Sequence, residues 1–175
     1  MRVGILAGVV AAVAVAIFAP GASAGSAAAA SAPRCKTSHL EVWFGLGLGG
    51  GTLGSVYYPL EFSNVGHSAC TLNGFPGVSA VGSGGGQLGP AASRNGQHHG
   101  TVTLAPGATA HAILRVEDAG ALCAHPVNAV GLKVFPPGAT ASQSVPFSFA
   151  ACAHRGVLIV GPLRAGVGIP GFTTS

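Results

Sequence analysis

The fold is decided by the stretch Val56-Tyr57-Tyr58-Pro59-Leu60-Glu61-Phe62-Ser63-Asn64-Val65-Gly66. Side chains of a β-strand alternate between the two faces of a sheet. The pattern predicts a strand with one apolar face, formed by Val56, Tyr58, Leu60 and Phe62, and one polar face with Tyr57, Glu61 and Ser63. Because Pro59 has no N–H, we expect the strand to lie at a sheet edge or to be bulged there. Asn64-Val65-Gly66 is expected to end it as a turn.

Short extended runs of the same kind recur along the chain, separated by turns rich in Gly and Pro. They are residues 39–44, 69–72, 78–81, 101–104, 109–117, 129–135, 144–149 and 157–160. The turn Ala105-Pro106-Gly107 predicts that 101–104 and 109–117 form a hairpin. After the first residues no long helical period is found. The pattern favours an all-β fold, an immunoglobulin-like antiparallel β-sandwich of about eight strands.

The N-terminus has the features of a secretory signal peptide. Met1-Arg2 is positively charged, residues 3–19 are apolar, and Ala22-Ser23-Ala24 fits a cleavage site. We predict a signal peptide over residues 1–24, a flexible linker over 25–34, the β-sandwich over 35–162 and a loose C-terminal tail over 163–175. The expected location is secreted or cell-wall associated, with no membrane span after cleavage. An uncleaved N-terminal anchor is the alternative.

Four cysteines follow the predicted signal peptide: Cys35, Cys70, Cys123 and Cys152. An even number in an exported chain predicts two disulfides, and four cysteines allow three pairings. We favour Cys35–Cys70 and Cys123–Cys152, because these are neighbours in sequence and close loops of similar size. A zinc site is not expected, since no two cysteines have a short C-x-x-C spacing.

The charge pattern gives no sign of a nucleic-acid-binding protein. The chain has a formal net charge of +4, from eight Lys and Arg against four Asp and Glu, and these residues are scattered along the sequence. Charged residues make up 7% of the chain and hydrophobic residues 49%. That hydrophobic content is too high for a disordered chain, so we expect a folded domain without a nucleic-acid partner.

No catalytic machinery is recognisable, and we predict a non-enzyme without a cofactor. The four acidic residues are Glu41, Glu61, Glu117 and Asp118, and the adjacent pair would point apart on a strand. The only G-x-S-x-G match lies in the predicted signal region, at 21–25. Residues 45–50 match G-x-G-x-x-G, but strand rather than helix is expected to follow, so a dinucleotide site is not predicted.

The remaining candidates are histidines and aromatic residues. The seven histidines allow an alternative in which the chain is a small extracellular enzyme or a metal-binding protein, but we predict no specific metal site. Outward positions of the first two strands give a candidate ligand surface: His39, Glu41, Trp43 and Tyr57. Loops carry binding sites on rigid scaffolds, so residues 45–51 and 82–100 are expected to meet the ligand. The expected function is a non-catalytic binding or interaction module whose partner is an envelope component or glycan.

One block of the sequence resembles a known family. Residues 62–78 read FSNVGHSACTLNGFPGV, a strand ending in Phe-x-Asn-x-Gly, then Cys-Thr-Leu, then a Gly-aromatic-Pro-Gly turn. This block resembles the signature of an exported actinobacterial family, domain of unknown function 4232. Residues 102–107 and the alternating run after them resemble its second block, and the four cysteines match in order. The resemblance covers about Cys35 to Pro162 and implies a secreted or wall-associated β-sandwich with no established catalytic residues.

Overall fold

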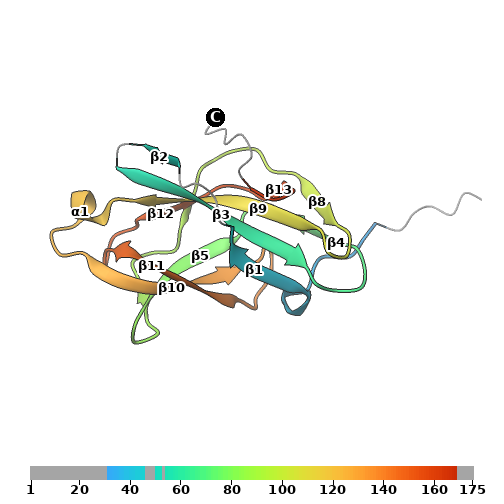
Figure 1. Ribbon diagram of the computed structural model, residues 1–175, viewed down its shortest axis with the longest axis horizontal. Helices are drawn as coiled ribbons and strands as arrows, with labels where there is room; N and C mark the ends of the chain where they lie inside the picture. Colours follow the sequence, from blue (N-terminus) through green and yellow to red (C-terminus); the bar gives the residue numbers. More distant parts are fainter. Residues whose placement is uncertain (1–30, 46–49, 53, 169–175) are drawn as a thin grey trace, which may run out of the picture. The chain divides into compact units, whose positions relative to one another are not determined.

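The computed structural model describes residues 31–45, 50–52 and 54–168, and its central element is the strand expected from the deciding stretch. This strand, β3 (Ser55–Asn64), is the longest in the described residues. It pairs antiparallel with β9 (Thr109–Glu117) from Ser55 opposite Glu117 to Ser63 opposite Thr109. The two strands cross the middle of Figure 1 side by side. Leu60 and Phe62 are fully buried, as their alternation predicts.

The prediction that Pro59 marks a sheet edge or a bulge is wrong. Strand β3 has neighbours on both sides, because β1 (Leu40–Phe44) and β2 (Gly50–Thr52) pair with it opposite β9. Pro59 lies between the stretch that pairs with β1 and the stretch that pairs with β2. Its carbonyl accepts the N–H of Gly45 at 3.1 Å, so its nitrogen also faces that side. The missing N–H of Pro59 therefore removes no hydrogen bond between β3 and β9.

The described strands form three sheets. The seven-stranded sheet has the order β1-β3-β9-β12-β7, with β2 beside β3 and β13 beside β9. The four-stranded sheet has the order β11-β10-β5-β6, and β4 pairs with β8. The remaining bounds are β4 (Cys70–Asn73), β5 (Gly77–Gly82), β6 (Gln87–Leu88), β7 (Ser93–Arg94), β8 (Thr101–Leu104), β10 (Val127–Phe135), β11 (Gln143–Ala151), β12 (Leu158–Val160) and β13 (Arg164–Ala165). The helical elements are η1 (Thr37–His39) and α1 (Ala119–Leu122).

The expectation of a mostly β chain is confirmed, but two details differ. The described residues contain thirteen strands rather than about eight, because β2, β6, β7 and β13, with only two or three residues each, lie outside the predicted runs. The predicted hairpin of 101–104 with 109–117 does not form: β8 pairs with β4, whereas β9 pairs with β3. The turn between them is present, with the Ala108 N–H bonded to the Ala105 carbonyl, but it carries the chain from one sheet to another.

A single apolar core is formed by side chains from all three sheets. In β9 the buried residues alternate, namely Ala110, Ala112, Leu114 and Val116. Aromatic rings join the two larger sheets: Phe44 of β1 stacks on Phe147 of β11 with centroids 4.3 Å apart. Tyr58 of β3 meets the same ring edge-on at 4.9 Å. Such contacts between strands far apart in sequence hold the sheets together.

The preferred cysteine pairing is confirmed. Cys35–Cys70 joins the beginning of the domain to β4, and Cys123–Cys152 joins the residue after α1 to the residue after β11. The four cysteines are all paired. Two disulfides are consistent with an extracellular protein, since such bonds persist in oxidising compartments.

The turn after β3 gives the Asn-x-Gly of the deciding stretch a structural role. The Asn64 side chain is buried, and its Oδ1 accepts the Gly66 N–H at 3.0 Å. Its Nδ2 donates to the carbonyls of Ser68 and Leu104, at 2.9 and 3.0 Å. One amide therefore closes the predicted turn and ties it to β8.

The described parts of the predicted linker and of the predicted tail are bonded to the β domain. The Thr71 N–H bonds to the Pro33 carbonyl, and Arg34 Nη1 donates to the Gly138 carbonyl at 3.1 Å. At the other end Leu163 is buried, and β13 pairs with β9. The predicted signal peptide, residues 1–24, lies outside the described residues. In the described part of the chain, no helix is long and apolar enough to cross a membrane.

Candidate functional site

The predicted ligand residues lie mainly on the outer face, the face of the seven-stranded sheet turned away from the core. Glu41 and Trp43 project from β1 with exposed side chains, and Trp43 Nε1 donates to Ser63 Oγ at 3.1 Å. His39 is exposed but belongs to η1 rather than to the strand. Trp43 lies opposite Glu61 of β3, and Tyr57 lies four residues from Glu61 along the same strand. Four residues of a strand span roughly 13 Å, so Tyr57 is far from Trp43. The structure therefore does not gather the four residues into one site.

The most unexpected residue of the outer face is Glu61. It lies between Trp43 of β1 and His111 of β9, and its side chain is 0% exposed because residues 166–168 cross over it. Glu61 Oε1 accepts the Gly168 N–H at 2.8 Å. His111 Nδ1 lies 2.8 Å from the Gly166 carbonyl, which secures the same segment. Glu61 Oε2 is buried and has no hydrogen-bond partner among the described residues.

Burial raises the pKa of Glu61 above its ordinary value, although the Gly168 N–H and the neighbouring His111 act in the opposite direction. The sequence pattern assigned Glu61 correctly to the face away from the core. It gave no sign that the C-terminal segment would cover that face. Because Gly168 covers this carboxyl, we do not assign it to a ligand site.

A polar hollow of about 210 Å³ opens on the same face around Tyr57. Tyr57, Ile113, Arg115 and Ile159 come from neighbouring strands of the sheet, and Asn95, Gln97 and Gly161 complete the lining. Residues 95 and 97 belong to the loop expected to meet a ligand, 82–100. The hollow thus joins one predicted surface residue to one predicted loop. It combines aromatic, aliphatic, amide and guanidinium groups.

The guanidinium in this hollow is held in a fixed orientation. Arg115 Nε donates to Ser55 Oγ at 3.0 Å, and Nη2 donates to Glu117 Oε1 at 2.6 Å. Gly161 leaves room for the amide of Asn95, since a Cβ there would lie 3.3 Å from Asn95 Nδ2. Sequence alternation places Arg115 outward on its strand, but the contribution of Asn95 and Gln97 depends on a loop path that no local pattern specifies.

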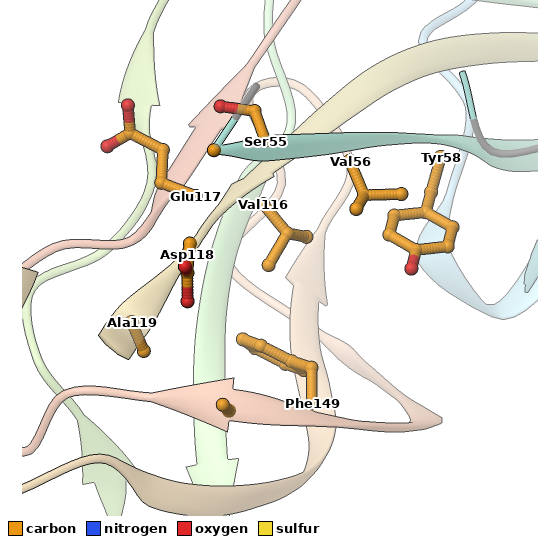
Figure 2. Close-up of a pocket in the computed structure, with 10 residues that line it drawn as sticks. Ser55, Val56, Tyr58, Val116, Glu117, Asp118, Ala119 and Phe149 are labelled. Carbon is orange, nitrogen blue, oxygen red and sulfur yellow. The ribbon is translucent and has the colours of Figure 1, made fainter. Parts of the chain in front are cut away.

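A second, more apolar groove of about 430 Å³ lies between β3, β9 and β11. Figure 2 shows Val56, Tyr58 and Val116 pointing toward the side where Phe149 lies. Val56 belongs to the inner face of β3 yet is 38% exposed, because the groove leaves it uncovered. The groove contains few polar groups that are free to orient a ligand.

The acidic residues beside the groove are engaged in the structure. Glu117 is paired with Arg115, and Asp118 caps α1 by accepting the Gly120 N–H at 2.9 Å. Figure 2 shows their carboxylates pointing in different directions, so they form no acid–base pair. In the described residues no group of three or more His, Cys, Asp and Glu side chains could hold a metal ion.

These features define a mostly β domain with two disulfides and a polar hollow on its larger sheet. A model of the family described as Domain of unknown function (DUF4232) matches residues 35–164. The match covers most of the chain, so the chain belongs to this family. No curated protein and no solved structure matches it.

Proposed function

We propose that this chain is a secreted or envelope-associated, non-catalytic binding module built on an immunoglobulin-like β-sandwich. The two disulfides support an oxidising location, and residues 1–24 have the composition of a secretory signal. The seven- and four-stranded sheets that share one core support the sandwich architecture. A rigid scaffold of this kind presents ligand-binding groups on its faces and loops.

The proposed ligand is a glycan, bound in the hollow around Tyr57. The observation that carries this proposal is the composition of the hollow: an aromatic ring and two isoleucines beside two carboxamides and a fixed guanidinium. A sugar ring has apolar C–H faces and a rim of hydroxyl groups. The aromatic and aliphatic groups suit the faces, and the amide and guanidinium N–H groups suit the hydroxyl oxygens. At about 210 Å³ the hollow suits one sugar unit of a longer chain.

Binding without reaction is favoured by the state of the carboxyl groups. Glycoside hydrolysis needs two carboxyl groups on either side of the scissile bond. The carboxyl nearest the hollow, Glu117, is bonded to Arg115, and Glu61 is covered by Gly168. A ligand in the hollow would therefore meet hydrogen-bond donors rather than an acid and a base.

The test is binding of the mature, oxidised chain to an array of bacterial cell-wall polysaccharides, followed by titration calorimetry on the best ligand. We expect Tyr57→Ala and Asn95→Ala each to weaken binding roughly 10-fold or more, as losses of central contacts do. The matched control is Trp43→Ala, which removes an exposed aromatic ring from the same face outside the hollow.

Unfolding midpoints of all variants must be compared with the wild type, so that a loss of structure is recognised. Binding that survives Tyr57→Ala but is lost in Trp43→Ala would move the site away from the hollow. Absence of any glycan binding by the folded chain would overturn the proposal.

A further inference from the structure

A cluster of basic side chains lies at the end of the loop that lines the hollow. It consists of Arg94 and His99, which contact the half-buried ring of Phe75, together with His98 and with Arg164, which is bonded to the His98 backbone; we call it the basic patch. The four basic residues are all exposed. In the sequence Arg94 and Arg164 are seventy positions apart and look like isolated charges. The fold joins them through this loop.

The members of the basic patch are held by specific contacts. The Arg94 guanidinium lies over the Phe75 ring, 5.3 Å from its centroid. His99 meets the same ring edge-on, with centroids 5.6 Å apart. Arg164 Nη2 donates to the His98 carbonyl at 3.0 Å. Stacking and a backbone hydrogen bond restrain both guanidinium groups while leaving several of their N–H donors available.

Among the described residues, no salt bridge joins an acidic side chain to this patch. The chain has only four acidic side chains, of which Glu61 is buried under Gly168 and Asp118 caps α1. The only ion pair in the described part of the chain joins Arg115 to Glu117. Arginines without a carboxylate partner give the patch a positive electrostatic potential, which attracts an anionic ligand and not a neutral one.

We propose that the glycan bound by this module is acidic, and that the basic patch binds its carboxylate or phosphate groups next to the Tyr57 hollow. This inference rests on the proposed function and specifies its ligand class. Residues 95 and 97 line the hollow, and His98 and His99 follow them directly in the same loop. A polymer with one sugar in the hollow would thus carry its neighbouring substituents onto the patch. Guanidinium groups bind carboxylate and phosphate through charge-assisted hydrogen bonds.

An acidic glycan fits this surface better than a nucleic acid does. The Phe75 ring is half-buried and covered by Arg94 and His99, so it offers no free face on which a base could stack. The hollow beside it adds amides and isoleucines to Tyr57 and Arg115, and this mixture of polar and aliphatic groups suits a sugar. Binding of a single-stranded oligonucleotide is measured as the alternative to acidic glycan binding.

The experiment uses matched polymers that differ in charge alone. Uronic-acid polysaccharides are compared with their carboxyl-reduced counterparts, and a phosphorylated mannan with its dephosphorylated form, by titration against the mature, oxidised chain. We expect tighter binding to the acidic member of at least one pair, weakened by salt because screening reduces attraction between exposed charges. Arg94→Gln and Arg164→Gln should each weaken that binding roughly three- to fivefold, the size expected of one exposed charge pair.

The control variants are Arg34→Gln and Arg155→Gln, which remove the same charge elsewhere. Both guanidinium groups are exposed and bonded to a backbone carbonyl, of Gly138 and Leu122, as Arg164 is to that of His98. They should leave binding unchanged. An equal loss of affinity in all four variants would show a general effect of net charge and would overturn the assignment of the basic patch as the binding site.

The two proposals fail in different ways. Binding that depends on Tyr57 but is equal for charged and neutral polymers, with no effect of Arg94→Gln or Arg164→Gln, would overturn the acidic ligand and leave the glycan module standing. Binding of acidic glycans that depends on these arginines but not on Tyr57 would instead overturn the proposal that the hollow binds the sugar. An oligonucleotide that binds more tightly than every acidic glycan would overturn the ligand class.

Discussion

Replacing Glu61 by Gln tests whether the covered carboxyl makes stability depend on pH. Burial raises the pKa of Glu61 above the ordinary glutamate value of 4.5, so at a pH between the unfolded and the folded pKa the folded chain retains a proton that the unfolded chain has released. The stabilising effect is complete below the unfolded pKa and is lost as the pH rises through the folded pKa. Within that window the free energy of unfolding should fall by up to about 1.4 kcal/mol per pH unit, the limit for one titrating group.

The variant Glu61→Gln should abolish this dependence. Glutamine keeps an oxygen that can accept the Gly168 N–H, but it carries no titrating proton. The measurement is urea unfolding of the oxidised chain at a series of pH values, from below the ordinary glutamate pKa to neutral pH. The wild-type stability minus that of Glu61→Gln should decrease across the series.

The control is Glu41→Gln, an exposed glutamate on the neighbouring strand β1. It should not reproduce the trend, since an exposed carboxyl is solvated in both states. A wild-type minus Glu61→Gln difference that stays level or increases with pH would refute the reasoning. It would mean that Gly168 and His111 outweigh burial at this carboxyl.

Three further outcomes follow from the fold. Replacing Cys123 and Cys152 by Ala opens a loop with a sequence separation of 29 and should cost about 3.6 kcal/mol in chemical denaturation, whereas a loss below about 1 kcal/mol would contradict the loop-entropy estimate. Asn64→Ala removes three hydrogen bonds of a buried side-chain amide and should cost roughly 2–4 kcal/mol. The backbone amide of Gly66 loses its acceptor in this variant, so its protection in hydrogen exchange should fall at the same time. Gly89→Ala combines a φ of +63° with a Cβ that would lie 2.5 Å from a backbone carbonyl oxygen, so it should lower the melting temperature more than Gly85→Ala, which has φ +78° and open space; equal effects would show that the close approach is relieved.

Much of the framework could be predicted from local pattern. The alternation in β3 and β9 predicts two long strands, which form the central pair, and the order of the cysteines favours, among three pairings, the two disulfides that form. What local pattern cannot specify is which strands become neighbours. The turn at 105–108 has the residues of a hairpin turn, yet it joins strands of different sheets, since β8 pairs with β4 and β9 pairs with β3.

The candidate site shows the same division. Tyr57 is predictable as an outward aromatic residue, and the loop 82–100 as a place where ligands bind. Their meeting, and the arrival of Asn95 beside Arg115, follows from the parallel pairing of β7 with β12. The burial of Glu61 depends on the path of residues 166–168. Neither long-range path leaves a periodic signal in the sequence.

The two disulfides also decide how the chain responds to a pulling force. A pull between the two ends of the domain passes from Cys35 directly to Cys70 and from Cys123 directly to Cys152, through covalent bonds. Residues 36–69 and 124–151 are bypassed, so β1 and β3 in the first loop and β10 and β11 in the second cannot be drawn out while the bonds are intact. Only the chain outside these two loops can lengthen, so a tether through this domain would extend less under force while the disulfides are intact than after they are reduced.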